Sequence, residues 1–347
     1  MKRLTLEEIG KIAGVSRSTV SRVVNEQENV KPAVRARVKA VIEEMGYQPN
    51  SAARILAGHA AQIIALIIPQ TAQSVFTDPY FPRLVQGVAQ ACNQYDYSVS
   101  LLLFHAREDE AKLYPRILRN QMFDGVVMTA THLNNPLIEK MTERNIPFVL
   151  VGGAEEEHIN YVDVNNFEGA YMAMEHLYNV GHRRIALIAG PDDNLASIKR
   201  YEGYRQFLQD KGLPFDSSLV FHGDFSETSA FEGAQKLLMH NPDAIFAVSD
   251  TMAVGALRSL QLVGLHVPQD IALMGYDDLA PSLLTEPQLS TVHQPVLETG
   301  AMAVETLLDI LKNGDKPTRR VVLPTKIVVR DSCGAKQRYH IEGDAYL

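Results

Sequence analysis

The chain has 347 residues, of which 46% are hydrophobic and 21% are charged, a globular composition that excludes a disordered or fibrous chain. At roughly 100–200 residues per domain, we expect two or three domains. Its two cysteines, Cys92 and Cys333, are too few for a disulfide framework, so we expect a reducing compartment. The sequence has no apolar run of about 18 residues. Residues 1–8 lack the apolar stretch of a signal peptide, so we expect a cytoplasmic protein without a membrane partner.

Basic residues concentrate at the N-terminus. Residues 1–60 carry a formal charge of +4, whereas the remainder carries −12. A small basic segment in front of an acidic body predicts that only the first part of the chain meets a polyanion such as DNA.

Residues 1–48 are predicted to form a small all-α head of three helices. The first begins with a capping box, in which Thr5 caps the helix and Glu8 reaches back to it, and ends at Gly14. Ser16 is the expected N-cap of the second helix, and Pro32 favours the start of a third. A helix, a tight turn containing glycine and a polar second helix predict a helix-turn-helix head.

The exposed face of the second helix carries hydrogen-bond donors and acceptors but no acid. Arginine can bond a guanine edge through two parallel hydrogen bonds, and hydroxyls with first-turn N–H groups can hold phosphates. A solvated three-helix bundle without DNA is the alternative that amphipathicity alone leaves open. The residues expected to contact DNA from this helix are Ser16, Arg17, Ser18, Thr19, Ser21, Arg22 and Asn25.

Residues 5–25, 46–50 and 53–58 closely resemble the headpiece of the LacI/GalR family of bacterial transcription regulators. The resemblance implies a hinge at 49–60 that becomes helical when two copies meet in the minor groove, since so short a helix is unstable alone. Leu56 would then be the apolar wedge between base pairs, and packing of Leu56 on the body is the alternative. The resemblance adds Thr5, Asn50 and Ala53 to the DNA-binding residues and implies a homodimer on near-palindromic operator DNA.

Beyond residue 60, apolar runs of strand length alternate with amphipathic stretches, which predicts an α/β body of two lobes, each a parallel sheet with covering helices. The expected strands are 63–68, 98–104, 125–128, 148–151, 161–164, 184–188, 244–248 and 271–274. The expected helices are 81–95, 170–180, 197–211, 229–239 and 252–262. With the family's resemblance to periplasmic sugar-binding proteins, the body spans 61–340, with lobe one at about 61–162 and 293–322 and lobe two at about 163–292 and 323–340.

Polar and aromatic residues follow the predicted strands, and ligands of parallel sheets bind beyond the carboxyl ends of the strands. Carboxylates and arginine can bond paired hydroxyls, and the aromatic rings of Tyr80 and Phe81 can stack on a sugar face. Residues 69–81 are expected to form a long loop. The candidate effector residues are Asp78, Tyr80, Phe81, Asn194, Arg200, Asp250 and Asp277, and the family resemblance adds Phe225. Core packing of the two aromatic rings and a surface position of Arg200 are the alternatives that spacing alone leaves open.

The family resemblance continues through the body, in residues 161–165, 181–188, 200–204, 247–253, 275–278 and 289–295. Family effector contacts fall at Arg200, Asp250, Asp277 and the aromatic pair, and Asp78 stands where many relatives carry asparagine. The resemblance implies a repressor controlled by a small molecule, with a mono- or oligosaccharide favoured. A nucleoside- or purine-responsive regulator of the same family and a solute-binding protein are the alternatives.

Motifs of catalysis and cofactor binding are missing from the sequence. It contains no Gly-x-Gly-x-x-Gly, Gly-x-Ser-x-Gly or Walker phosphate loop. The paired acids at 192–193 and 277–278 have no histidine or cysteine set at ligand spacing. We therefore expect no enzyme activity, no cofactor and no metal.

Overall fold

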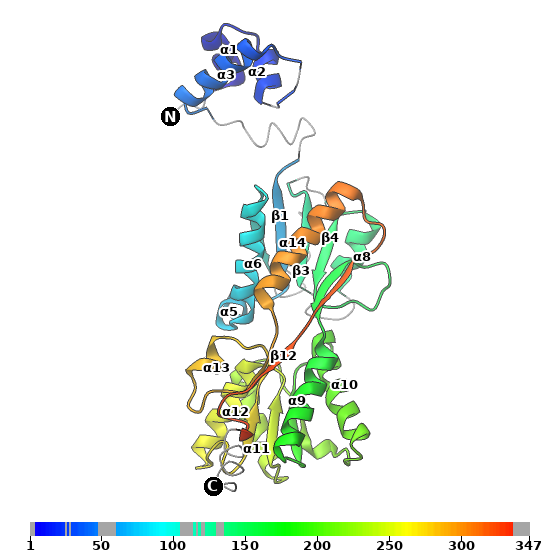
Figure 1. The fold of residues 1–347 in the computed structure, drawn as a ribbon. Coiled ribbons are helices and arrows are strands. Elements are labelled where there is room, and N and C mark those ends of the chain that lie inside the picture. The colour runs from blue at the N-terminus through cyan, green and yellow to red at the C-terminus, as the bar shows by residue number, and fades with distance from the viewer. Residues whose placement is uncertain are drawn as a thin grey trace, which may run out of the picture. The chain divides into compact units, whose positions relative to one another are not determined.

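The computed structural model describes residues 4–24, 26–27, 29–47, 60–104, 114–115, 117–118, 122–129 and 135–335. The chain divides into two compact units, Met1–Ala61 and Gln62–Leu347 (Figure 1). Four predicted DNA-binding residues lie outside the described residues, as do residues 49–59 of the predicted hinge: Asn25, Asn50, Ala53 and Leu56.

The first unit is the predicted all-α head. Its helices are α1 (Leu6–Ala13), α2 (Arg17–Val24) and α3 (Pro32–Glu44). The capping box is confirmed: the Thr5 hydroxyl accepts from the Glu8 N–H at 3.3 Å, and the Glu8 carboxylate accepts from the Thr5 N–H at 2.7 Å. Gly14 ends α1 at a φ of 64°, which glycine adopts without strain. A small core joins the helices through Ile9, Ala13, Val20, Val23 and Val38.

Lobe one contains a six-stranded parallel sheet in the order β11-β5-β4-β3-β1-β2. Its strands are β1 (Ile63–Ile68), β2 (Ser98–Leu103), β3 (Gly125–Thr129), β4 (Phe148–Val151), β5 (Tyr161–Val164) and β11 (Arg320–Leu323). Its helices are α5 (Ala72–Thr77), α6 (Tyr80–Gln94), α8 (Pro136–Glu143) and α14 (Val296–Asn313). On β1, Ile64 and Leu66 face α6 and α14, whereas Ala65 and Ile67 face α8. Burial of both faces explains the uninterrupted apolar run of this strand.

Lobe two contains a four-stranded parallel sheet in the order β7-β6-β8-β9. Its strands are β6 (Ile185–Ala189), β7 (Val220–His222), β8 (Ala244–Ala247) and β9 (Ala272–Met274). Its helices are α9 (Asn166–Val180), α10 (Leu195–Asp210), α11 (Glu227–Leu238), α12 (Asp250–Leu262), α13 (Ala280–Leu284) and a 3-10 turn at Ser217–Leu219. Helix α9 packs on α10 and α11 on α12, and both pairs contact the sheet.

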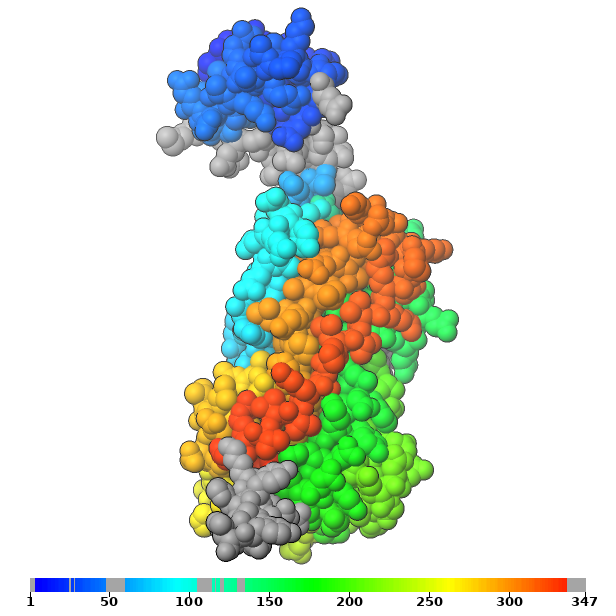
Figure 2. Space-filling model, viewed as in Figure 1, coloured from blue at the N-terminus to red at the C-terminus, as the bar shows by residue number. Residues whose placement is uncertain are grey.

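The chain crosses between the lobes three times. It leaves lobe one between β5 and α9, returns through β10 (Thr291–His293) into α14, and leaves again from β11 into β12 (Lys326–Val328). β10 and β12 pair antiparallel, so two crossings are hydrogen-bonded to each other. Figure 2 shows the last crossing as an orange-red band on the surface that runs from one lobe to the other.

The predicted fold class is confirmed, and each of the eight expected strands overlaps an observed one. The prediction of a long loop at 69–81 is wrong, because α5 forms within it. Thr71 caps this short helix by accepting from the Ser74 N–H at 3.0 Å, and Val75 is buried. A helix of six residues is too short to show a helical period of apolar residues in the sequence. Among the described residues, no helix is long and apolar enough to span a bilayer.

Candidate functional site

Arg200 lies at the centre of a buried polar network at the carboxyl ends of the lobe-two strands. It projects from α10 and is 5% exposed. Its Nε donates to Oδ1 of Asn166 at 2.9 Å and its Nη1 to the Val248 carbonyl at 2.6 Å. The guanidinium lies 3.6 Å from the centre of the Tyr276 ring, and Nη1 lies 3.6 Å from Oδ1 of Asp277. These contacts come from three separate segments, the start of α9, the residue after β8 and the residues after β9, and they fix the guanidinium in one orientation.

Asp277 follows β9 and is held in a conformation that non-glycine residues rarely adopt. Asp277 and Asp278 have φ values of 120° and 61°, and such residues persist where the surrounding structure holds them. The Asp277 N–H donates to the Val292 carbonyl at 2.7 Å, and its carboxylate accepts from the Gln294 side-chain amide. Burial raises the pKa of the Asp277 carboxyl well above its ordinary value, although the charge of Arg200 opposes the rise. Backbone strain and the cost of burying a carboxylate therefore coincide at Asp277, a combination that is typical of functional sites.

Asp163, at the end of β5, joins the same network. Its carboxylate accepts from Nδ2 of Asn166 at 3.1 and 3.2 Å and from the Val164 N–H at 2.8 Å. Burial raises the pKa of this carboxyl to about 6, and the backbone N–H of Val164 and the charge of Arg200 limit the rise. Asn166 thus connects Asp163 to Arg200, and the network reaches the first crossing between the lobes.

Lobe one contributes Asp78 and Tyr80. Oδ1 of Asp78 accepts from the Tyr80 N–H at 3.0 Å, and the Tyr80 and Phe81 rings meet edge to face with centres 5.4 Å apart. Burial raises the pKa of the Tyr80 phenol, and the negative charges of Asp163 and Asp277 raise it further. Tyr80 of lobe one therefore faces carboxylates at the strand ends of both sheets. The structure brings five residues close together where the two lobes meet, and we call this group of residues the cleft: Asp78, Tyr80, Asp163, Arg200 and Asp277.

Asp250 is fully buried and bonded within the protein. Its Oδ1 accepts from the Thr291 hydroxyl at 2.6 Å and its Oδ2 from the Leu279 N–H at 2.9 Å. Burial raises the pKa of this carboxyl to about 7. These bonds tie the start of α12 to β10, a crossing strand, and explain the burial without a ligand. Its predicted contact with an effector stays a prediction.

Asn194 and Phe225 also have structural contacts. Asn194 caps α10, with its Oδ1 accepting from the Ser197 N–H at 3.0 Å. The Phe225 ring packs so closely on Gly190 that a Cβ there would lie 2.5 Å from it. Both residues shape the strand ends beside Arg200, and their contacts with an effector stay predictions, as does that of Phe81.

The sequence analysis did not select four residues of the network: Asp163, Asn166, Tyr276 and Gln294. The first three directly end or follow a strand, β5 or β9, so the strand-end rule was a sufficient signal for them. Gln294 follows β10, a three-residue strand that the sequence pattern did not reveal.

The head presents the predicted DNA-binding face on α2. Ser16, Arg17, Ser18 and Arg22 are exposed, Thr19 and Ser21 are half-buried, and Val20 and Val23 pack inward. The Ser16 hydroxyl lies 2.8 Å from that of Ser18 and 2.9 Å from that of Thr19, and it caps the helix by accepting from the Thr19 N–H at 3.2 Å. Hydroxyls and first-turn N–H groups gather at the helix N-terminus, where a phosphate can be bound. Thr5 is exposed at the start of α1.

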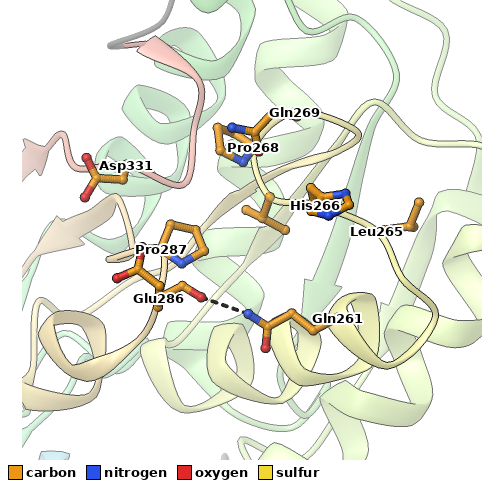
Figure 3. A pocket seen from close by; sticks show the side chains of 9 residues that line it. Gln261, Leu265, His266, Pro268, Gln269, Glu286, Pro287 and Asp331 are labelled. Atoms are coloured by element: carbon orange, nitrogen blue, oxygen red, sulfur yellow. Dashed lines mark hydrogen bonds between the residues drawn. The ribbon is translucent and has the colours of Figure 1, made fainter.

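A hollow of about 440 Å³ lies in lobe two (Figure 3). It is formed by the end of α12, the segment that precedes β9, and the residues after α13, at the amino-terminal side of the strand. None of the candidate effector residues lines it, so it is separate from the cleft. Its lining is Gln261, Leu265, His266, Val267, Pro268, Gln269, Glu286, Pro287 and Asp331. In the part of the chain that the structure describes, no cluster of three His, Cys, Asp or Glu side chains could hold a metal ion.

A helix-turn-helix head joined to a two-lobed α/β body with polar side chains at its strand ends is typical of a DNA-binding transcription regulator. Residues 5–50 match the bacterial regulatory proteins of the lacI family, and residues 61–331 match the periplasmic binding proteins and sugar binding domain of the LacI family. The chain belongs to the LacI family and is a transcriptional repressor of that family.

Similar proteins agree over nearly the whole chain. The HTH-type transcriptional regulator CelR of Thermobifida fusca is 38% identical over 95% of this chain and 98% of its own length. The repressor PurR of Aliivibrio salmonicida is 32% identical over 94% and 98%. A solved complex of CelR with cellobiose has a TM-score of 0.76 at 36% identity, covering 95% of this chain and 100% of that one. The lac repressor dimer bound to operator and the anti-inducer ONPF has a TM-score of 0.84 at 27% identity, covering 96% and 99%.

We predict that Asp163→Asn changes how stability depends on pH. The folded-state pKa of about 6 lies above the ordinary 3.8, so the folded state binds this proton more tightly. Stability from this group is complete below pH 4 and is lost as the pH rises through 6. Urea titrations from pH 4 to 7 should show wild type losing up to about 3 kcal/mol relative to the variant.

Asp216→Asn is the control of opposite sign. Hydrogen bonds from Ser218 lower the pKa of Asp216, so wild type should lose stability relative to that variant only as the pH falls below about 4, and the difference should stay constant from pH 4 to 7. A pH-independent difference between wild type and Asp163→Asn would contradict the account of Asp163.

Proposed function

We propose that this repressor binds near-palindromic operator DNA as a homodimer and that a sugar in the cleft between its lobes controls that binding. Residues 1–48 bind DNA, 49–60 form the hinge, and 61–340 hold the effector. The observation that carries the proposal is the gathering of polar side chains from both lobes, in which the charges of the buried pair of Arg200 and Asp277 act on Tyr80 of the opposite lobe. Because the same chain carries a helix-turn-helix head, ligand binding in the body can change DNA binding by the head.

A sugar fits the cleft better than a purine does. The carboxylates of Asp163 and Asp277 accept hydrogen bonds from hydroxyls, and Arg200 donates to hydroxyl oxygens. The Tyr80 and Phe81 rings are inclined at 85°, so they do not form a parallel pair that encloses a flat base. Cellobiose is the ligand of the CelR complex, and we propose a β-linked glucose disaccharide as the first effector to test.

Gln294 connects the effector site to the movement of the lobes. It is 6% exposed, lies between β10 and α14 at the second crossing, and donates to Asp277 of lobe two. A sugar hydroxyl that bonds Asp277 competes with this amide. The ligand therefore changes a contact at the crossing itself, and the lobe arrangement that binds it better becomes more populated.

The homodimer uses the side of the body that carries α5 and α13. Leu283 is 50% exposed, Leu284 83% and Phe76 69%, and Val75 of α5 shares an apolar cluster with Leu279 beside α13. Large exposed apolar groups on neighbouring helices are typical of protein interfaces. A second copy is the occupant we propose, because a two-fold operator requires two heads.

Leu284→Glu should therefore weaken the dimer by at least about a hundredfold, because it places a carboxylate in an apolar interface. Sedimentation equilibrium measures the change. Met239→Glu is the control, since Met239 is 79% exposed at the end of α11. If Leu284→Glu dimerises as tightly as wild type, the interface lies elsewhere.

Arg22→Ala should cost about 1–3 kcal/mol in binding to DNA selected from a random palindromic library, and should relax preference at one base pair. Arg37→Ala removes the same charge from the exposed face of α3 and should leave base preference unchanged. Fluorescence anisotropy on selected and random duplexes measures both variants. Equal affinities of Arg22→Ala and wild type for both duplexes would remove Arg22 from the readout.

Cellobiose should weaken binding to the selected operator by about 5- to 150-fold, the usual range of coupling between two sites. Operator DNA must then weaken cellobiose binding by the same factor, which calorimetry with and without operator measures. Asp277→Asn should bind operator but lose the response, whereas Asp192→Asn, on an exposed loop after β6, should keep it. Identical operator affinity with and without saturating sugar would refute the proposed control.

A further inference from the structure

The cleft has an unbalanced charge. Asp78, Asp163 and Asp277 bring three carboxylates to it, from both lobes and from the first crossing. Arg200 supplies the compensating positive charge, and it already donates to Asn166 and Val248. Asp277 pairs with Arg200, and among the described residues Asp78 and Asp163 form no ion pair. These two acids make the cleft rich in acceptors and, above the pKa of Asp163, negatively charged.

The neighbouring segments do not restore the balance. The stretches that follow β1, β5, β6, β7, β8 and β9 contain no lysine or arginine apart from Lys199 and Arg200, and Lys199 pairs with Glu202 at 2.8 Å. The stretches without a basic residue are 69–80, 165–168, 190–198, 223–227, 249–252 and 275–279. They add further acids, among them Glu168 and Asp224. Among the described residues, an anion at this site would meet repulsion from Asp78 and Asp163 and attraction from Arg200, because Arg330 is paired with Asp278.

We infer that the cleft selects uncharged, hydroxyl-rich sugars and rejects phosphorylated and carboxylated ones, and that Asp78 and Asp163 set this selection. The inference rests on the proposed sugar effector and narrows its chemical class. Sugar hydroxyls donate to carboxylates, so the acids bind a neutral sugar well. An anion at about 10 Å from one carboxylate loses roughly fifteenfold in affinity at an effective dielectric constant of about 20.

The selection should depend on pH, because Asp163 titrates within the range from pH 5.5 to 7.5. Burial raises the pKa of Asp163 to about 6 and raises that of Asp78. A carboxylated sugar stays ionised at pH 5.5, whereas Asp163 becomes largely protonated there. The ratio of the affinity for the neutral sugar to that for the carboxylated sugar should therefore decrease as the pH falls from 7.5 to 5.5.

The test is calorimetry on the full-length protein with three probes: cellobiose, cellobiose 6-phosphate and the disaccharide that carries a carboxylate at C6. Wild type at pH 7.5 should bind cellobiose at least about thirtyfold more tightly than either anion. Asp78→Asn and Asp163→Asn should each reduce that ratio about tenfold, because each removes one repelling charge. Asp96→Asn is the matched control: it removes an exposed carboxylate at a φ of 59°, which asparagine tolerates, and should leave the ratio unchanged.

The possible failures are distinguishable. Binding of cellobiose 6-phosphate within threefold of cellobiose overturns the selection and leaves the sugar effector standing. If Asp96→Asn lowers the ratio of neutral to anionic affinity as much as Asp78→Asn and Asp163→Asn do, the effect comes from net charge. That result overturns the role of these two acids. Failure of all three probes to bind overturns this inference together with its basis, the β-linked glucose disaccharide. Circular dichroism of each variant establishes that the body remains folded.

Discussion

The burial of the Arg200 guanidinium constrains the rest of the cleft. A buried charge that loses its partner costs about 3–5 kcal/mol, so the fold has to bring partners to it. Asn166 at the start of α9, the Val248 carbonyl after β8 and the Asp277 carboxylate after β9 all converge on this one group. Each partner stands at the carboxyl end of a strand or the first turn of a helix. The arginine therefore organises the strand ends before any ligand arrives.

The partners of Arg200 are also the residues through which the lobes communicate. Asn166 belongs to the first crossing through its bond to Asp163, and Asp277 is bonded to Gln294 at the second. Asp250 holds Thr291 of the same crossing strand. Two crossings thus end in hydrogen bonds to the group of acids that surrounds the cleft. A change in the protonation or bonding of these acids acts directly on the segments that must bend when the lobes move.

Much of this arrangement was predictable from sequence because it depends on local rules. The capping box of Thr5 and Glu8 and the alternation of apolar runs with amphipathic helices follow from neighbouring residues, as does the position of Asp277 after a strand. Arg200 lies inside a helix, and its selection depended on the family resemblance. The helix α5 and the role of Gln294 were not predictable in this way. A six-residue helix gives too few residues for periodicity, and β10 gains its order from pairing with β12, some 35 residues distant in sequence. Asp250 shows the converse limit, since its position suggested a ligand contact and the structure gives its carboxylate two internal donors.

The unfavourable features of the body lie together at one place. The sheets have fully apolar cores, while Asp277 carries backbone strain and burial raises the pKa of Asp163, Asp250 and Asp277. Such costs persist when they serve a function and the rest of the fold offsets them. A ligand that donates hydrogen bonds stabilises the ionised carboxylates and lowers their pKa values, so its binding releases protons. The ligand binds most strongly to the lobe arrangement in which acids from both lobes contact it. The buried acids therefore give the ligand a higher affinity for one lobe arrangement than for the other. Only such a difference in affinity lets a ligand change the populations of the two arrangements.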